Sequence, residues 1–228
     1  MDRAPHFERS AGWMQAAYLA RVVDINDPES RNRVQVRLYS FDDVDGQDAP
    51  LWARVVCPFA GADRGAFFMP DVDDEVLVVF VQGDPRHPLV IGGLWNGANA
   101  APASLSGGTN QYKRIRSKNG VVVTLDDQQG QEKLVLETPA GQKLTLSDGP
   151  GKVRVEDSNG NSVVMEASGI TITAAAQVKV DAANVKVSAG MVTVDAAMAK
   201  FSGVVKCEVL IATSVVGTSY TPGAGNVW

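Results

Sequence analysis

The chain has 228 residues, of which 45% are hydrophobic and 21% are charged, as in an ordinary folded protein with enough material for a core. A formal net charge of −5 and an aromatic content of 7% argue against nucleic-acid binding, which uses basic patches and stacking rings. The sequence has neither a run of about 18 apolar residues to cross a membrane nor a secretory signal at its start, so we expect synthesis in the cytoplasm without a signal peptide.

Residues 1–15 are interpreted as an N-terminal arm, and residues 16–98 as a β-domain. This domain contains five Val-rich segments that predict strands: residues 16–25, 32–40, 51–59, 74–82 and 87–95. Sequences rich in Asp, Gly and Pro separate these segments, as expected of turns. Five short strands in about 80 residues predict an all-β fold of the OB type, which is a small five-stranded barrel.

A stretch of small residues with Pro and Gly, residues 99–110, is typical of a linker. Residues 111–214 are then predicted to form a second region of short strands. In its first part, tight-turn sequences such as NG, PAG and SNG separate the strand segments. From about residue 170 onward the turns shrink, and Val, Ala, Gly, Ser and Asp dominate.

The stretch VKVDAANVKVSAGMVTVDAAM, residues 178–198, repeats every seven residues, as a coiled coil does. Its valines, however, come in pairs two positions apart: Val178 and Val180, Val185 and Val187, Val192 and Val194. A spacing of two places both side chains on one face of a strand, whereas on a helix they lie about 200° apart. β-Branched residues also favour strands. The repeat therefore predicts a β-solenoid with one short strand per seven residues.

The core of this solenoid is expected to be narrow, because its inward residues are only Val, Ile and Ala. A narrow core suits a thin prism in which three copies of the chain wind around one axis. With about a dozen strands per chain, three copies would give about 12 layers and a needle roughly 55–60 Å long. The expected fold is thus an OB-fold barrel followed by an intertwined, trimeric, triangular β-helix.

Candidate sites for chemistry are few. Asp74 and Glu75 form an acid pair, but hydrogen bonding at a strand start is the favoured interpretation over glycoside hydrolysis. Gly83–Asp84–Pro85 fits a loop better than a phosphate cradle, and residues 148–153 lack the Walker spacing. The acidic loop at residues 125–132 lacks the EF-hand spacing for calcium. We expect no catalytic residues, no metal and no cofactor.

Two histidines and two cysteines complete the inventory. His6 lies in the predicted arm and His87 in a turn, which disfavours a Ser-His-Asp triad. Cys57 and Cys207 are predicted to be buried free thiols, with a disulfide as the alternative. No Cys-His cluster indicates zinc.

Residues 52–96 combine the motifs Trp-x-Arg-Val, Gly-x-x-x-Gly, Asp-Glu-Val, Gly-Asp-Pro and Gly-x-Leu-x-Asn. The distinctive positions are Trp52, Arg54, Gly61, Gly65, Pro70, Glu75, Gly83, Asp84 and Pro85. In this order they resemble the OB-fold of contractile-tail spikes, the family of phage baseplate assembly protein V and the valine–glycine repeat spikes of type VI secretion. Asp73 stands where the family usually has Gly, so this turn is expected to differ. Residues 115–146 are similar to the start of the spike's β-helix.

The resemblance implies a homotrimer with an N-terminal collar and a C-terminal needle. Such a protein is the non-enzymatic central spike of a contractile injection machine, in a phage tail or a phage-tail-like particle. It docks under the baseplate hub, plugs the tube and pierces the target outer membrane when the sheath contracts. The expected location is the tail baseplate of a virion or extracellular contractile particle, and no nucleic-acid partner is expected.

Residues 215–228 are interpreted as a tip segment, because one Pro and two Gly break the repeat. The open strand edges at the end of a needle need a cover. The candidates are Tyr220, Pro222, Val227 and Trp228, as a cap or, by the resemblance, as a platform for a PAAR-repeat tip protein. A frayed tail is the alternative. Some family members bind iron at the tip through a His-x-His pair, which this segment lacks.

Three other functions stay open. A type VI secretion spike carrying effectors usually fuses hub, collar and needle, and the short arm at residues 1–15 favours a separate hub. An OB-fold that binds oligonucleotides or glycans, trimerised by a β-solenoid, is disfavoured by the net charge and the few aromatics. A glycan-cleaving tail spike needs a wider β-helix with acids in a groove.

Overall fold

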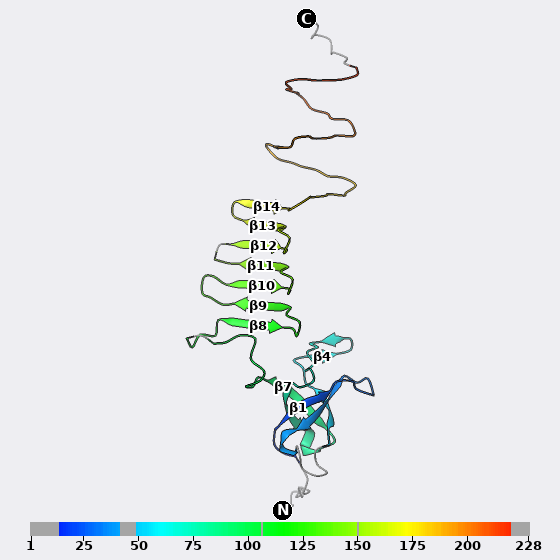
Figure 1. The fold of residues 1–228 in the computed structure, drawn as a ribbon, viewed down its shortest axis with the longest axis vertical. Helices are drawn as coiled ribbons and strands as arrows, with labels where there is room; N and C mark the ends of the chain where they lie inside the picture. Colours follow the sequence, from blue (N-terminus) through cyan, green and yellow to red (C-terminus); the bar gives the residue numbers. More distant parts are fainter. Residues whose placement is uncertain (1–13, 42–48, 106, 150, 220–228) are drawn as a thin grey trace, which may run out of the picture. The chain divides into compact units, whose positions relative to one another are not determined.

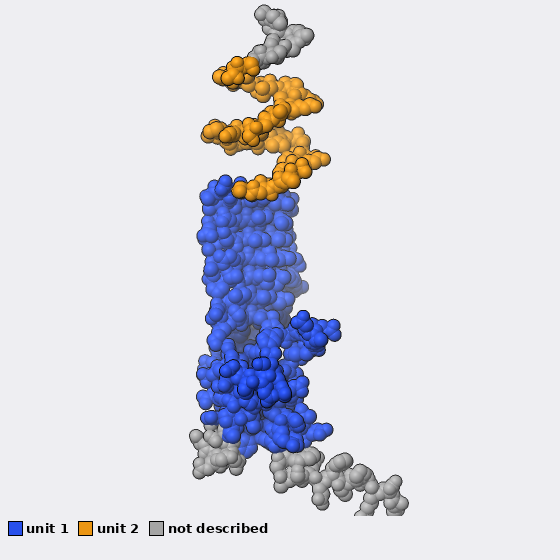
Figure 2. Space-filling model, turned by 90° about the vertical axis from the view of Figure 1, so that its right-hand side faces the viewer, with its two compact units in different colours: residues 1–178 blue, residues 179–228 orange. Residues whose placement is uncertain are grey.

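The computed structural model describes residues 14–41, 49–105, 107–149 and 151–219. The chain divides into two units, residues 1–178 and residues 179–228, which Figure 2 shows in different colours. The first unit contains a small barrel and a seven-stranded sheet, and the described part of the second is a single extended segment. No helix in the described ranges is long and apolar enough to cross a membrane.

The barrel consists of the five strands that sequence alternation predicts (Figure 1). They are β1 (Tyr18–Asp24), β2 (Arg33–Leu38), β3 (Leu51–Val55), β6 (Glu75–Phe80) and β7 (Pro88–Leu94). Their order around the barrel is β1-β2-β3-β7-β6, and pairing between β6 and β1 closes the ring. All neighbours are antiparallel except β3 and β7. The predicted all-β fold with a five-stranded barrel is confirmed.

Small and β-branched side chains fill the barrel. Ten residues form its buried core: Ala20, Val22, Val34, Val36, Leu38, Ala53, Val76, Val78, Phe80 and Val90. They occupy alternate positions on their strands, because successive side chains of a strand point to opposite faces. Each fully buried Val contributes about 1.5–2 kcal/mol to folding, which makes the barrel the stable part of a single chain.

Three short elements complete the barrel region. The segment predicted as a plain turn forms a small hairpin of β4 (Ala60–Gly61) and β5 (Arg64–Gly65). Two 3-10 turns follow strands, η1 (Tyr39–Phe41) after β2 and η2 (Val81–Gly83) after β6. A side chain at Gly65 would place its Cβ 2.9 Å from the carbonyl oxygen of Phe59, so this position admits only glycine.

The second sheet is an antiparallel meander in which every strand pairs with its sequence neighbours (Figure 1). Its strands are β8 (Tyr112–Arg116), β9 (Val122–Asp126), β10 (Lys133–Glu137), β11 (Lys143–Ser147), β12 (Lys152–Glu156), β13 (Ser162–Glu166) and β14 (Gly169–Thr173). A β-rich C-terminal region was expected and is confirmed. In this part the backbone hydrogen bonds between strands join successive strands of the same chain.

A five-residue turn recurs three times at one edge of this sheet, at residues 117–121, 138–142 and 157–161. In each turn the backbone N–H of the first residue donates to the carbonyl oxygen of the fifth, at 2.9, 3.0 and 3.1 Å. The N–H of the fifth residue donates back to the side-chain oxygen of the first, which is Ser117, Thr138 or Asp157. Ser, Thr and Asp favour such turns because their short side chains hydrogen-bond to nearby backbone.

The fourth residue of each turn is a glycine in the left-handed region. The φ angles of Gly120, Gly141 and Gly160 are 89°, 87° and 88°, which disfavour residues with a Cβ atom. Neighbouring turns also approach each other, since a Cβ at Gly120 would lie 3.3 Å from Pro139. The three turns therefore stack as one repeated structure along this edge.

The segment of residues 179–219, here called the C-terminal segment, contains no helix or strand. Its backbone bends at Ala183, Gly190 and Ala197, seven residues apart. These bends lie in the small-residue corners that separate the Val pairs of the repeat. The absence of a helix in this described segment agrees with the interpretation that the repeat is not a coiled coil.

Candidate assembly interface

The two faces of the seven-stranded sheet differ in chemistry. Residues that pair directly in an antiparallel sheet point to the same side, so the register sorts them into rows. One face carries two apolar rows, here called the apolar ladders. The first is Leu125, Leu134, Leu146, Val153, Met165 and Ile170, and the second is Ile115, Val123, Leu136, Leu144, Val155, Val163 and Ile172.

The opposite face is polar and carries hydrogen bonds suited to water. Its central row consists of Arg114, Thr124, Val135, Thr145, Arg154, Val164 and Thr171. Lys152 Nζ lies 3.0 Å from Glu166, and Arg154 donates to Glu156 at 2.7 Å. Lys152 holds the pKa of Glu166 below its ordinary value by hydrogen bonding, with Ser168 helping. Such pairs belong at a solvated surface, so this face is the outer one.

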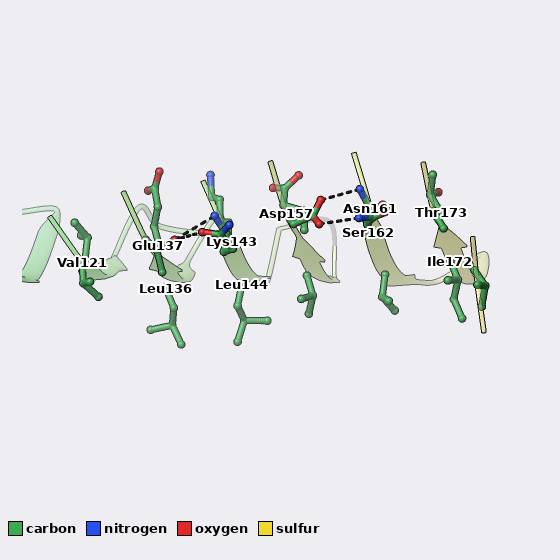
Figure 3. A pocket seen from close by; sticks show the side chains of 18 of the residues that line it. Val121, Leu136, Glu137, Lys143, Leu144, Asp157, Asn161, Ser162, Ile172 and Thr173 are labelled. Atoms are coloured by element: carbon green, nitrogen blue, oxygen red, sulfur yellow. Dashed lines mark hydrogen bonds between the residues drawn. The ribbon is translucent and has the colours of Figure 1, made fainter. Parts of the chain in front are cut away.

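The apolar ladders remain largely uncovered in one chain. Leu136, Leu146 and Val155 are exposed. The first ladder ends in Ile170 and the second in Ile172, and both side chains are more than 60% exposed. Figure 3 shows Leu136 and Leu144 pointing to the side opposite Glu137 and Lys143. A contiguous apolar surface of this extent marks an interface, because each Leu removed from water contributes about 2 kcal/mol.

A groove runs beside the second apolar ladder, near the stacked turns (Figure 3). Its volume is about 800 Å³, and residues from β9 to β14 line it together with the chain just after β14. Val121, Leu144, Ile172 and Val178 contribute apolar surface. At its polar rim, Asn161 donates to Asp157 through its amide at 2.7 Å, which lowers the pKa of Asp157 to about 2. The groove thus lies over the second apolar ladder and adds a concave region to the apolar face.

The backbone of the C-terminal segment lacks hydrogen-bond partners within the described chain, just as the apolar ladders lack a covering surface. Among the described residues, no backbone hydrogen bond joins two positions of this segment. Its paired valines, such as Val185 and Val187, are exposed. Backbone groups in folded proteins are nearly always paired, and a Val-rich chain is poorly suited to remain in water. The segment therefore requires further chains to supply its strand partners.

The motif residues of the barrel lie mostly on its outer surface. Trp52 faces outward, with the guanidinium of Arg33 5.7 Å from its ring centre. Arg54 is exposed and pairs across the sheet with Arg33. Together with Arg86 they line a cleft of about 710 Å³. The structure thus brings the Trp-x-Arg motif and the turn after Gly-Asp-Pro to one place.

The Gly-Asp-Pro turn is held by its own charges. Gly83 is buried, with a φ of 78°, and its carbonyl oxygen accepts a hydrogen bond from the N–H of Met14. Asp84 binds Arg86 through both carboxylate oxygens, and this lowers the pKa of Asp84 to about 2. Pro85 lies between them in the exposed loop. The residues fix the connection between β6 and β7.

The remaining motif residues shape loops. Gly61 and Gly65 belong to the β4–β5 hairpin, and Pro70 is half-buried in the loop that follows. Glu75 Oε2 accepts a hydrogen bond from the Asn96 side-chain amide at 2.6 Å. Asp73 has a φ of 73°, so it adopts the left-handed conformation that a glycine would take there.

The four candidate tip residues, Tyr220, Pro222, Val227 and Trp228, lie outside the described residues. The two thiols are free, as predicted. The prediction that both are buried is wrong for the single chain, since Cys57 is half-buried and Cys207 is exposed. Within the described residues, no group of three or more His, Cys, Asp or Glu side chains is placed to hold a metal ion.

Asp27 is a structural residue that the sequence reasoning missed. Its side chain is only 4% exposed and accepts hydrogen bonds from the backbone N–H groups of Glu29, Arg31 and Arg33. The Arg33 guanidinium also donates to it, at 2.7 and 3.1 Å. Arg33 and these N–H groups hold the pKa of Asp27 well below its usual range. The carboxylate thereby orders the loop between β1 and β2.

Replacing Asp27 with Asn is expected to lower the melting temperature of the barrel at pH 7, because the amide cannot accept all of these bonds as an anion does. The folded pKa of Asp27 is lowered, so its stabilisation is present above the unfolded value of about 3.9 and fades as pH falls below it. Thermal unfolding of both proteins between pH 3 and pH 7 measures the difference. Asp63→Asn, at an exposed carboxylate, is the control. A deficit that persists undiminished at pH 3 contradicts this account.

Sequence profiles of two protein families match the chain. A family described as the type VI secretion system/phage-baseplate injector OB domain matches residues 18–95, which contain the whole barrel. A family described as the phage baseplate V C-terminal trimerisation domain matches residues 133–199, from β10 into the C-terminal segment. The second match covers the apolar ladders from β10 to β14 and two of the Val pairs of the C-terminal segment.

Several spike proteins are similar over less than half of the chain. The type VI secretion system spike protein VgrG1b of Pseudomonas aeruginosa is 26% identical over 113 residues, 46% of this chain and 15% of its own length. VgrG4b of the same organism is 32% identical over 108 residues, 45% of this chain and 13% of its own. VgrG3 of Vibrio cholerae is 33% identical over 94 residues, 40% of this chain and 9% of its own. The match thus covers only a small part of these longer relatives.

Proposed function

Because the chain belongs to the family of phage baseplate V proteins and type VI secretion spikes, we propose that three copies assemble into the puncturing spike of a contractile injection machine. The observation that carries this proposal is the continuous apolar face of β8–β14, which one chain leaves uncovered. Three such faces, turned toward a common axis, bury the apolar ladders of all copies and keep the polar faces in water. The match to a trimerisation domain over residues 133–199 supports the number three.

The spike acts by mechanical rigidity and has no enzymatic role. Each wall is a meander whose backbone is paired along its whole height, and the C-terminal segments of the three copies wind together beyond residue 178. Contraction of the sheath supplies the work, and a stiff trimer transmits the force to a small area of the target outer membrane. Both matched families are spike or baseplate domains, which supports a structural role.

The barrel is the collar in this proposal. It docks the spike under the baseplate hub and plugs the lower end of the tube. The clustering of Trp52, Arg54 and Arg86 in one outer cleft supports a binding role for this surface. A PAAR-repeat protein at residues 220–228 is the proposed tip partner. The protein is assembled into the baseplate of a phage tail or a phage-tail-like particle.

A type VI secretion spike that carries effectors is the second candidate. The relatives named above, all of them type VI spike proteins, favour it. The mechanics of the trimer are the same in both machines, and the difference lies in the hub and the cargo. Electron microscopy of contractile particles from cells that produce the chain distinguishes them, because a phage-type particle is released whereas a secretion system stays anchored in its cell.

The trimer is tested by mass. One chain has a mass of 24.2 kDa, so three copies have three times that mass, about 73 kDa. Sedimentation equilibrium or mass photometry of the purified full chain is expected to give this value over a wide concentration range. A monomer at micromolar concentration contradicts the proposal. Tight binding of single-stranded DNA or a glycan at physiological salt would favour a binding module instead.

A further inference from the structure

The rhythm of the C-terminal segment changes near Gly203. Up to Ala197 the backbone bends every seven residues. Beyond that point it bends at Ser202–Gly203, Glu208, Thr213 and Thr218, so the last three intervals are five residues long. The match to the trimerisation domain ends at residue 199, close to this change. The last part of the segment thus follows a pattern of its own.

The apolar side chains follow the same change. After the bends at Ala183 and Gly190, the second and fourth residues are Val, as in Val185 and Val187, whereas Ala199 and Phe201 take these places after Ala197. In the five-residue repeat the second residue is again large and apolar: Val205, Leu210 and Val215. The fourth residue is small and decreases in size along the chain: Cys207, Ala212 and Gly217. Each of these small residues lies directly before a bend, where a large side chain would crowd the corner.

Exposure distinguishes the two sides of the five-residue repeat. Val205, Leu210 and Val215 are 61%, 71% and 69% exposed. Of their apolar neighbours, Val204, Ile211 and Val216 are 98%, 94% and 97% exposed, and Val209 is 75% exposed. The first set is comparable to the valines of the seven-residue repeat, such as Val185 at 66% and Val187 at 71%. The first set therefore lies on the inner side of the winding chain, and the second set on its outer side.

We propose that residues 203–219 bind the same segment of two further copies to form a second, narrower section of the trimer. Each chain contributes one large apolar side chain per wall in this section and two in the section before it. The inference rests on the proposed function, since it requires the trimer. The partner is a second copy because the inner positions continue the pattern that follows Ala183 and Gly190, with a large apolar residue two positions after the bend.

Wall length sets the width of such a section. At about 3.3 Å per residue, a seven-residue wall spans at most about 23 Å and a five-residue wall about 17 Å. In a triangular prism of these dimensions, symmetry-related Cβ atoms at the inner position lie about 6 Å apart in the narrow section. They lie about 9 Å apart in the wide one. A disulfide requires a Cβ separation of about 4 Å, so only the narrow section comes within a small shift of it.

Disulfide trapping in the full chain tests this arrangement. The background carries Cys57→Ser and Cys207→Ser, and single cysteines are introduced as Leu210→Cys, Val215→Cys, Ile211→Cys and Val185→Cys. After mild oxidation, Leu210→Cys and Val215→Cys are expected to give disulfide-linked dimers on non-reducing gels. Their yield is expected to be at least tenfold that of Ile211→Cys or Val185→Cys. No more than two chains in three can be linked, because three thiols form one disulfide.

The mass of each variant separates the inference from the proposed function. A background protein that sediments as a monomer overturns the proposed trimer and the narrow section with it. A protein of about 73 kDa in which neither Leu210→Cys nor Val215→Cys forms dimers overturns the narrow section alone. Equal dimer yields at positions 210 and 185 in the trimer also overturn it, because they indicate a constant width.

Discussion

Leu144→Asp is expected to abolish the trimer. Leu144 lies in the middle of the second apolar ladder, paired directly with Leu136 on one side and Val155 on the other. In the proposed assembly three copies of the new carboxylate face one another in a dry core, and each buried, unpaired charge costs several kcal/mol. Sedimentation is expected to show monomers of 24.2 kDa or aggregates in place of the trimer. The barrel, whose core is separate, is expected to stay folded.

Thr145→Asp is the matched control for this substitution. Thr145 is the next residue of the same strand, on the polar face, and pairs directly with Arg154. The same new side chain there meets water and a guanidinium, so the trimer is expected to persist with an unchanged mass. A trimer of normal thermal stability in Leu144→Asp would show that the apolar ladders are not the interface.

Val187→Asp is expected to remove resistance to SDS while leaving a trimer in native buffer. The reason is that the backbone N–H and C=O groups of the β8–β14 sheet and those of the C-terminal segment find their hydrogen-bond partners in different ways. The strands of the meander pair within one chain, so walls can separate without breaking backbone hydrogen bonds. The C-terminal segment has no such pairs within the described chain, so its hydrogen bonds must form between copies, and separation breaks all of them. That section is therefore the kinetic barrier to dissociation.

Gel electrophoresis without boiling measures this effect. The unmodified protein and the control Lys186→Asp are expected to migrate as trimers, because Lys186 precedes Val187 directly and in an extended chain points to the opposite side. Val187→Asp is expected to migrate as a monomer in SDS and still to sediment as a trimer without it. Full SDS resistance of Val187→Asp would place the kinetic barrier elsewhere.

The barrel was predictable because its chemistry is local. Alternating Val on segments such as residues 74–82 places every second side chain inside, and Asp-, Gly- and Pro-rich sequences end each strand. The β4–β5 hairpin was missed because two-residue strands carry no periodicity. Asp27 was missed for another reason. Its role depends on the loop folding back so that Arg33 and three backbone N–H groups reach the carboxylate. A single Asp in a predicted turn does not indicate these contacts.

For the sheet of β8–β14, the alternation of apolar and polar residues predicts the strands but not which strands pair with one another. A period of two predicts strands, but it does not say whether the neighbouring strand belongs to the same chain or to another copy. The three turns that close on Gly120, Gly141 and Gly160 decide the matter, since each reverses the chain at once. The glycines are visible in the sequence, but their positive φ angles are visible only in the structure. The seven-residue repeat beyond residue 178 has no such turns.

The stacked turn also makes the height of each wall adjustable in steps. The turns at residues 138–142 and 157–161 bracket one pair of strands, β11 and β12, within a unit of 19 residues, the difference between 157 and 138. Inserting or removing such a unit keeps the direction of the chain, the identity of both faces and the stacking of the turns. Each step changes the height by two strand spacings, about 10 Å. Tandem duplication of the gene segment that encodes one such unit would thus lengthen the wall without changing either of its faces.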